Sequence, residues 1–375
     1  MKIVYCILGT FNSGGMERVL TNKANYLVQE GHEVTIITSD QKSRPNYFPL
    51  DPRVKQIDLG INYTDYVDQK FLKKFFEYRR LRKKHALALR EALFHIGPDI
   101  TISMFDYEAS MLPKINDGSA KVIEIHFSRY KRLQYGRKGI MGLVDRYLNG
   151  RDQNIVIQYD RFVVLTEEDK GYWGDLDNIE VIPNANSFEP HSTAGLNEKR
   201  VIAVGRYDFQ KGFDDLIQIW RLVHQEVPEY KLDIFGKGPL EEEYKTLIQE
   251  LGLQNTVFLR APVKDIASEY LKSACVVMSS RYEGLPMALL EGQVCGLPMV
   301  SYTCKCGPKD IISDGVNGFL IPEGDKELFA SRVVQVLKDE DLRKEMGKNA
   351  KAMSDRFSEA EVMQKWLNLF NRLKK

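Results

Sequence analysis

Short apolar runs alternate with longer segments of helical periodicity along most of this chain, and the runs fall into two series. The first series of candidate strands is Lys2–Leu8, Glu33–Thr38, Val54–Leu59, Ile100–Met104, Val122–His126, Arg161–Leu165 and Ile179–Ile182. The second is Val201–Val204, Lys231–Phe235, Val257–Leu259, Cys275–Ser279, Met299–Tyr302 and Gly318–Ile321. Strands that alternate with helices are typical of parallel sheets covered by helices, so the pattern predicts an α/β fold.

A turn-rich segment separates the two series. It runs from Pro183 to Pro190, is rich in Pro, Asn and Ser, and lacks periodicity. At 375 residues the chain is also too long for one ordinary hydrophobic core. We therefore expect two domains, residues 1–187 and 188–356, with a ligand cleft between them at the carboxyl ends of the strands. The tail from about Asp325 is expected to be helical, with Trp366 and Phe370 on a packing face.

The composition is that of a globular protein in a reducing compartment. Hydrophobic residues make up 43% and charged residues 28%. No apolar stretch approaches the ~20 residues of a spanning helix. The five cysteines include no CxxC pair, which argues against a disulfide framework and against a zinc site. We expect a cytoplasmic protein.

The net charge of +1 hides two strongly basic runs. Residues 70–90 hold nine Lys/Arg against Glu77 alone, interleaved with aromatic residues, and residues 129–151 hold seven against Asp145. Basic amphipathic helices with aromatic side chains are typical of peripheral binding to anionic membranes. A solvated helix face is an equally simple interpretation. Nucleic acid is disfavoured, because no nucleic-acid-binding motif accompanies the runs.

The segment from Glu283 to Glu291 carries the most functional information. It follows an apolar run and leads into a helix, so Glu283 is expected on a strand-to-helix loop and Glu291 about two turns into the helix. Each carboxylate can accept hydrogen bonds from neighbouring hydroxyls. Gly284 and Leu285 offer backbone N–H groups at a helix N-terminus, where phosphate binds readily. This layout suits a nucleotide sugar, although a capped helix with two surface glutamates would look the same.

Other predicted strand ends offer complementary chemistry. Gly14 and Gly15 permit an anion to approach a helix N-terminus, and His126 ends a strand, where a catalytic and a structural histidine fit equally well. After Gly205, Arg206 and Lys211 supply two cations that suit one dianionic group. Gly236, Lys237 and Gly238 form a glycine-punctuated strand end where a flat base has room.

In their order along the chain, these motifs resemble family 4 of the retaining glycosyltransferases, and the similarity runs nearly end to end. The resemblance implies the GT-B architecture: two facing Rossmann-like domains with parallel sheets and an interdomain cleft. It also implies that a C-terminal helix, here about 357–375, packs back on the first domain. The region from Ser279 to Pro322 looks especially like members that build bacterial surface polysaccharides.

The resemblance assigns roles to individual residues. Arg206 and Lys211 would grip the donor diphosphate, Glu283 would bind hydroxyls of the transferred sugar, and Glu291 would bind the ribose. His126 would reach the sugar near the reaction centre. The remaining donor contacts would come from Gly14, Gly15, Gly205, Gly236, Lys237, Gly238, Gly284 and Leu285. Family members generally need no metal or other cofactor, and this sequence has no Asp-x-Asp triplet.

The resemblance therefore implies a retaining, metal-independent transferase that moves a hexose or N-acetylhexosamine from a nucleotide sugar, expected to be UDP-linked. The acceptor would be a lipid-linked oligosaccharide or a related glycan, and an anionic membrane surface would be a partner. Two other classes stay open: a sugar-nucleotide epimerase of the same architecture, and a non-catalytic partner subunit that binds nucleotide sugar.

Overall fold

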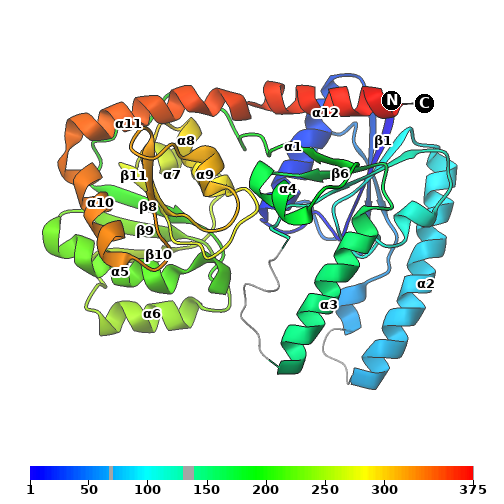
Figure 1. The fold of residues 1–375 in the computed structure, drawn as a ribbon, viewed down its shortest axis with the longest axis horizontal. Helices are drawn as coiled ribbons and strands as arrows, with labels where there is room; N and C mark the ends of the chain where they lie inside the picture. Colours follow the sequence, from blue (N-terminus) through cyan, green and yellow to red (C-terminus); the bar gives the residue numbers. More distant parts are fainter. Residues whose placement is uncertain (67–70, 130–138, 375) are drawn as a thin grey trace. The chain divides into compact units, whose positions relative to one another are not determined.

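The computed structural model describes residues 1–66, 71–129 and 139–374. The chain divides into two compact units, each a parallel sheet with helices against it (Figure 1). The first unit comprises Met1–His126, Arg137–Ile182 and Met363–Lys375, and the second comprises Phe127–Gly136 and Pro183–Val362. The chain thus leaves the first unit at Ile182, at the start of the turn-rich segment, and returns to it with its last helix.

Within the described residues, the first unit has a seven-stranded parallel sheet in the order β3-β2-β1-β4-β5-β6-β7. The expected strands are confirmed, with ends within two residues. The strands are β1 (Lys2–Ile7), β2 (Glu33–Thr38), β3 (Lys55–Asp58), β4 (Ile100–Ser103), β5 (Ala120–Glu124), β6 (Arg161–Val164) and β7 (Ile179–Val181). The helices of this unit are α1 (Gly15–Gln29), α2 (Phe71–Ile96), α3 (Gly139–Val156), α4 (Glu167–Trp173) and the part of α12 (Glu359–Leu373) that starts at Met363. Short 3-10 turns lie at Tyr63–Tyr66 and Leu112–Lys114.

The second unit has a six-stranded parallel sheet in the order β10-β9-β8-β11-β12-β13, again counted over the described part of the chain. Its strands are β8 (Arg200–Val204), β9 (Lys231–Phe235), β10 (Val257–Arg260), β11 (Cys275–Met278), β12 (Met299–Tyr302) and β13 (Gly318–Ile321). Its helices are α5 (Phe213–Glu226), α6 (Glu241–Glu250), α7 (Ile266–Leu271), α8 (Met287–Val294), α9 (Pro308–Ile311), α10 (Lys326–Lys338) and α11 (Glu340–Met353), with 3-10 turns at Phe209–Lys211 and Ser354–Phe357.

The central strands of both sheets are buried on their two faces, which explains why these strands read as mainly apolar runs. β1 and β2 are buried from their second residue on, and β11 and β12 are buried throughout. Parallel strands covered by helices on both faces have this composition. The close approach of α8 to β11 depends on Gly292, since a Cβ at Gly292 would lie 2.6 Å from a methyl carbon of Val276.

Two expectations about local structure were wrong by a few residues. Helix α8 begins at Met287, so Glu291 lies just over one turn into it rather than about two. Pro286 is its N-cap, because proline fixes its own φ and disfavours the helical conformation at Leu285. Strand β5 ends at Glu124, so His126 follows the strand by two residues instead of ending it.

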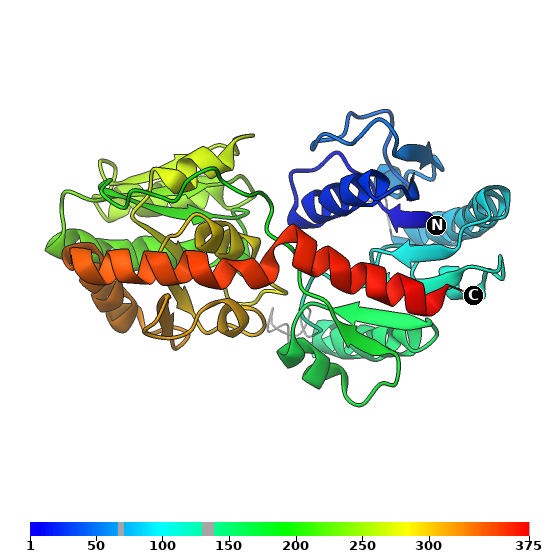
Figure 2. The same cartoon turned by 90° about the horizontal axis from the view of Figure 1, so that it is seen from above.

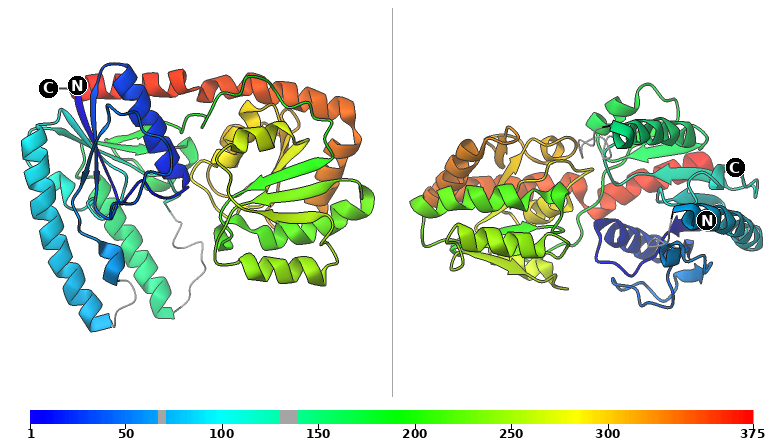
Figure 3. Two further views of the ribbon diagram at one scale, coloured as in Figure 1. Left: turned by 180° about the vertical axis from the view of Figure 1, so that it is seen from behind. Right: turned by 90° about the horizontal axis from the view of Figure 1, so that it is seen from below.

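The C-terminal helix and the two long helices of the first unit stand out in the figures. Helix α12 lies next to α1, as Figures 1 and 2 both show. Helices α2 and α3 project beyond the edge of their sheet, which is seen from behind in Figure 3. Among the described residues, no helix combines the length and the apolarity needed to cross a membrane.

Candidate active site

An ion pair between Lys211 and Glu283 is the centre of the candidate site in the second unit. Lys211 ends the 3-10 turn after β8, where the side chain of Asp208 caps the Lys211 backbone N–H, and Glu283 lies on the loop between β11 and α8. The Nζ atom of Lys211 lies 2.7 Å from Oε1 of Glu283, and the two side chains are 18% and 7% exposed. Gln210 donates a second, longer hydrogen bond of 3.4 Å to Oε2 of Glu283. The cation expected to bind phosphate and the carboxylate expected to bind sugar therefore form an ion pair with each other.

Arg206 is placed differently from Lys211. Its guanidinium is 70% exposed and pairs with Oδ2 of Asp208 at 2.7 Å. The structure therefore does not bring the two cations onto one partner: Arg206 pairs with Asp208, and Lys211 pairs with Glu283. An exposed guanidinium can turn toward an anion at low cost, because its present ion pair is in contact with water.

The glycines at the ends of β8 and β9 are explained by close packing of two loops. A Cβ at Gly236 would lie 1.9 Å from the carbonyl oxygen of Gly205, and a Cβ at Gly238 would lie 2.4 Å from that of Tyr207. Gly205 in turn leaves room for the stem of Lys211, since a Cβ there would contact the stem carbons at 3.0 Å. Lys237 is exposed beside them. These glycines let the two strand ends meet and let Lys211 reach Glu283.

Glu291 is buried on α8, and its carboxylate is held by Tyr270, whose hydroxyl donates to Oε2 at 3.1 Å. Gly284 and Leu285 lie just before the N-cap of α8, packed under Gly307. Within the part of the chain that the structure describes, the backbone N–H groups of Gly284 and Leu285 donate to no other residue. One segment therefore presents two buried carboxylates with free N–H donors between them.

In the first unit, the N-terminus of α1 already carries a carboxylate. Gly14 is the N-cap of α1 and Gly15 its first residue, and the Glu17 side chain folds back so that a Cβ at Gly14 would lie 2.2 Å from Oε2. Glu17 accepts from its own backbone N–H and from Asn12, and burial raises its pKa above the ordinary value. An incoming anion at Gly14 would have to displace Glu17, a residue that the sequence did not single out.

His126 lies beside a second ion pair, formed by Lys23 of α1 and Glu124 of β5. Nε2 of His126 is 3.4 Å from Oε2 of Glu124, and Nζ of Lys23 lies 2.8 and 2.7 Å from the two oxygens of Glu124. A signal for this pair was present in the sequence. Lys23 interrupts the apolar face of the helix between Leu20 and Leu27, and Glu124 interrupts an apolar strand.

A hollow of about 400 Å³ lies at neighbouring strand ends of the second unit. It is lined by Asp215, Ser280, Arg281, Tyr302, Lys305, Glu323 and Gly324. None of the site residues expected from the sequence is in this lining. One link to the ion pair is the Lys305 carbonyl, which accepts from the Glu283 backbone N–H at 3.2 Å.

Comparisons with known proteins give the family. The model described as "Glycosyltransferase Family 4" matches residues 13–186, and the one described as "Glycosyl transferases group 1" matches residues 186–353. The amylovoran biosynthesis glycosyltransferase AmsD of Erwinia amylovora is 28% identical and covers 99% of both chains. An α-1,4-N-acetyl-D-galactosaminyltransferase of Campylobacter jejuni, which acts on a diphosphoundecaprenol-linked saccharide, is also 28% identical, over 100% of this chain and 99% of the relative.

Solved structures share the fold. TarM of S. aureus, in complex with fondaparinux, α-GlcNAc-glycerol and UDP, superposes with a TM-score of 0.80 at 18% identity over 99% of both chains. HepE of Anabaena, in complex with UDP and glucose, superposes with a TM-score of 0.74 at 17% identity over 99% of this chain and 100% of that one. The two sheet-containing units have the GT-B fold of these transferases. With its two domains matched in succession, this chain belongs to the glycosyltransferases of family 4 and group 1.

Proposed function

We propose that this protein is a retaining glycosyltransferase that transfers a hexose or N-acetylhexosamine from a UDP-sugar to a lipid-linked oligosaccharide or related glycan. In the reaction, the bond between the anomeric carbon and the diphosphate oxygen breaks and a bond to an acceptor hydroxyl oxygen forms on the same face. The acceptor proton passes to the departing phosphate. The products are UDP and a glycan longer by one sugar.

The Lys211–Glu283 ion pair carries this proposal. Within the pair, the Lys211 cation and the Glu283 anion balance each other. An arriving diphosphate competes for Lys211, and Glu283 is then free to accept hydrogen bonds from the hydroxyls of the sugar. Charge neutralisation by Lys211 and Arg206 stabilises the departing UDP without a metal ion, and no carboxylate has to act as a nucleophile.

The rest of the donor is accommodated by the same unit. Glu291, held by Tyr270, accepts from the two ribose hydroxyls, and the N–H groups of Gly284 and Leu285 donate to phosphate. The base lies near Gly236, Lys237 and Gly238. Support for uridine comes from the two structural relatives named above, both of which were solved with UDP.

The nature of the acceptor is inferred from the relatives. The Campylobacter enzyme extends a saccharide on diphosphoundecaprenol, and the Erwinia enzyme serves the biosynthesis of amylovoran. Both relatives align over nearly their full length with this chain. We propose that the present enzyme likewise extends a polysaccharide precursor at the cytoplasmic face of a membrane.

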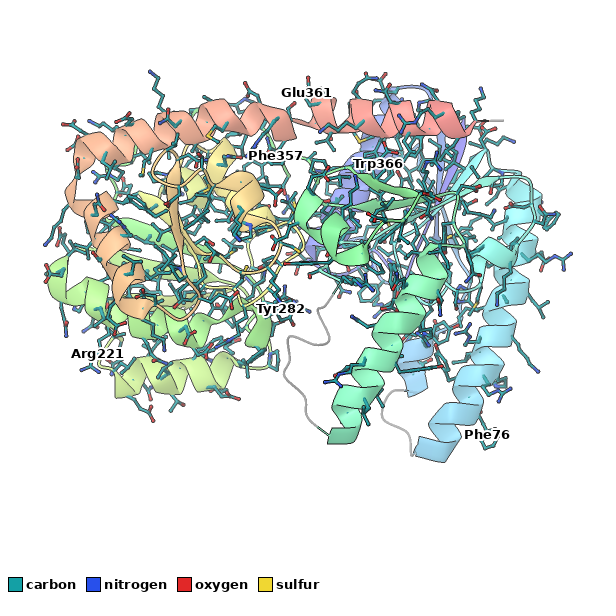
Figure 4. The ribbon with its side chains drawn as sticks, viewed as in Figure 1. Phe76, Arg221, Tyr282, Phe357, Glu361 and Trp366 are labelled. Carbon is teal, nitrogen blue, oxygen red and sulfur yellow. The ribbon has the colours of Figure 1, made fainter. Side chains whose placement is uncertain are left out.

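Two helices of the first unit supply a surface for that membrane. On α2, Phe76 is exposed (Figure 4). Leu87, Arg79, Lys83 and Arg90 of the same helix are exposed as well. On α3, the exposed apolar residues are Met141, Leu143, Val144 and Tyr147. The basic residues of 130–138 and Lys70 lie outside the described residues. Basic charge beside exposed apolar side chains favours binding to anionic lipid.

Thermal stabilisation of the purified chain by UDP-, GDP- and ADP-sugars, in the presence of a chelator, tests the donor assignment. A ligand at 100 times its Kd stabilises the folded protein by about 2.7 kcal/mol, which is readily measured. We expect stabilisation by one UDP-sugar that is lost in Glu283→Gln, while stabilisation by UDP itself remains. No stabilisation by any nucleotide would contradict the proposal and favour a non-catalytic partner subunit. Turnover of donor to an epimeric nucleotide sugar would favour the epimerase.

Sedimentation with vesicles containing anionic lipid tests the membrane surface. We expect Lys83→Gln combined with Arg90→Gln and Phe76→Ser to weaken binding. The matched control changes Lys272 and Lys338 to Gln, because these exposed lysines belong to the second unit and their loss changes the net charge equally. Equal binding by the two variants would indicate that α2 presents a solvated helix face and does not bind the membrane.

A further inference from the structure

The first unit contains a buried network of charged and aromatic side chains that ends at His126. Three elements far apart in the sequence contribute to it: α1 with Lys23, β5 with Glu124, and α12 with Trp366. Lys23, Glu124 and Trp366 are all at least nine-tenths buried. Figure 4 shows Trp366 on the C-terminal helix, and the Lys23 ammonium lies 3.6 Å from the centre of its ring.

Within this network, Lys23 contacts both Glu124 and the aromatic rings. The ammonium of Lys23 donates to both oxygens of Glu124, at 2.8 and 2.7 Å, and its remaining side faces the rings of Trp366 and Tyr5. A buried ammonium is tolerated only where an anion and cation–π contacts replace water. Burial alone would raise the pKa of Glu124, but the contacts with Lys23 and His126 lower it, which favours the carboxylate form.

Within this network, His126 lacks a complete set of hydrogen-bond partners. Its imidazole is 7% exposed, and Nε2 lies 3.4 Å from Oε2 of Glu124. Among the described residues, neither ring nitrogen has a hydrogen-bond partner of good geometry. A carboxylate facing Nε2 favours the tautomer with the proton on that nitrogen, which leaves the Nδ1 lone pair as an acceptor. A buried nitrogen without a partner needs an explanation, and a substrate hydroxyl that arrives on binding supplies one.

We infer that Glu124, Lys23 and Trp366 are positioning residues for His126: Glu124 orients the imidazole, Lys23 balances the charge of Glu124, and Trp366 shields Lys23 from water. This inference rests on the proposed function and on the role that the family resemblance implies for His126, beside the transferred sugar. It also gives the C-terminal helix a role in the active site, because the contact of Trp366 with Lys23 couples α12 to His126.

The charges around His126 predict opposite effects for the two members of the ion pair. Glu124 from β5 lies 3.4 Å from Nε2 of His126, and Glu17 from α1 also acts on the ring electrostatically, whereas Lys23 and Tyr5 act on Glu124. Glu124→Gln removes the carboxylate that favours the proton on Nε2, so the fraction of the Nε2–H tautomer falls. Lys23→Met leaves the Glu124 carboxylate without its cation, so that fraction rises.

The nitrogen NMR resonances of the His126 ring in the full chain, assigned by their loss in His126→Gln, report which ring nitrogen holds the proton and so test the inference. We expect opposite changes of the Nε2–H fraction in Glu124→Gln and Lys23→Met, and a return toward the wild-type fraction in the double variant. The double variant also serves if a single variant fails to fold, because it buries no unpaired charge. Lys121→Met is the matched control: it removes another buried cation, paired with Asp117, and should leave His126 unchanged.

The same series measures the role of Trp366. We expect Trp366→Leu to change the Nε2–H fraction of His126 in the direction of Lys23→Met, and Trp366→Phe to keep most of the wild-type fraction, because only Phe retains an aromatic face for Lys23. Changes in one direction for both ion-pair variants, or no change, would overturn the inference. Normal turnover by His126→Gln together with the expected changes would instead contradict the role that the family resemblance implies for His126 and leave the positioning network in place.

Discussion

Replacing Lys211 by Met should separate the contribution of the Lys211–Glu283 pair to stability from its contribution to catalysis. The substitution leaves the carboxylate of Glu283, 7% exposed, without its cation. Loss of one partner from a fully buried pair costs about 3–5 kcal/mol. Since Lys211 is 18% exposed and Gln210 still donates to Glu283, we expect a loss of about 2 kcal/mol. For a domain of this size that lowers the Tm by about 4–8 °C.

The double variant Lys211→Met, Glu283→Gln should recover most of that stability, because no unpaired charge is left in the site. Turnover should not recover with it. Lys211 is expected to stabilise charge that develops on the departing diphosphate, and Glu283 to bind the transferred sugar. We expect each single variant to lose at least about 100-fold in kcat/KM, or ~2.7 kcal/mol of barrier. The double variant should be no more active than the weaker single variant.

Scanning fluorimetry and release of UDP in the presence of acceptor measure the two quantities on the same preparations. Recovery of Tm without recovery of turnover would support separate roles in structure and catalysis. Near-normal turnover in either single variant would refute the assignment. Recovery of turnover in the double variant would show that the pair serves only to hold the loop, and the donor site would then have to lie elsewhere.

Three further predictions concern the same two units. Glu291→Gln should weaken UDP binding about tenfold in calorimetry, since about 1.5 kcal/mol of charge-assisted hydrogen bonding is lost, and an unchanged Kd would remove Glu291 from the ribose site. Gly236→Ala should lower both the Tm and UDP affinity, because its Cβ would lie 1.9 Å from the Gly205 oxygen, whereas Gly195→Ala, with no atom within 4 Å, should do neither. Burial, with a smaller contribution from a nearby arginine, lowers the pKa of His85 from 6.5 to about 4. As the pH falls, the unfolded chain therefore binds a proton at His85 before the folded chain does. The free energy of unfolding, measured in urea, should fall by up to about 3 kcal/mol between pH 6.5 and pH 4. If a His85→Phe variant lost the same free energy over this pH range, the prediction would be contradicted.

The sequence was most informative where one physical requirement governs several consecutive residues. Strands buried on both faces must be apolar throughout, so their positions were predicted to within two residues. The start of α8 was harder to predict. Pro286 is the N-cap and disfavours the helical conformation at Leu285, so the helix starts at Met287, later than the apolar pattern alone indicates.

The candidate site shows the same division. Lys211 and Glu283 were identified separately, as a cation and a carboxylate at two strand ends, but their ion pair joins positions 72 residues apart. The glycines near Gly236 were interpreted as space for a base, whereas the structure explains them by the contact between two loops. Glu17 was missed because its importance comes from a side chain that folds back over Gly14.

By itself, the sequence determined the two α/β halves, the order of their strands along the chain and the chemical types of side chain at the strand ends, because periodicity and loop chemistry are local properties. Only the tertiary structure decided which of those side chains meet. The pairing of Lys23 with Glu124, 101 residues away, and the approach of Trp366 from the C-terminal helix depend on how helices pack on a sheet. A buried ion pair is stable only when both partners arrive together, and no local pattern in a sequence records that coincidence.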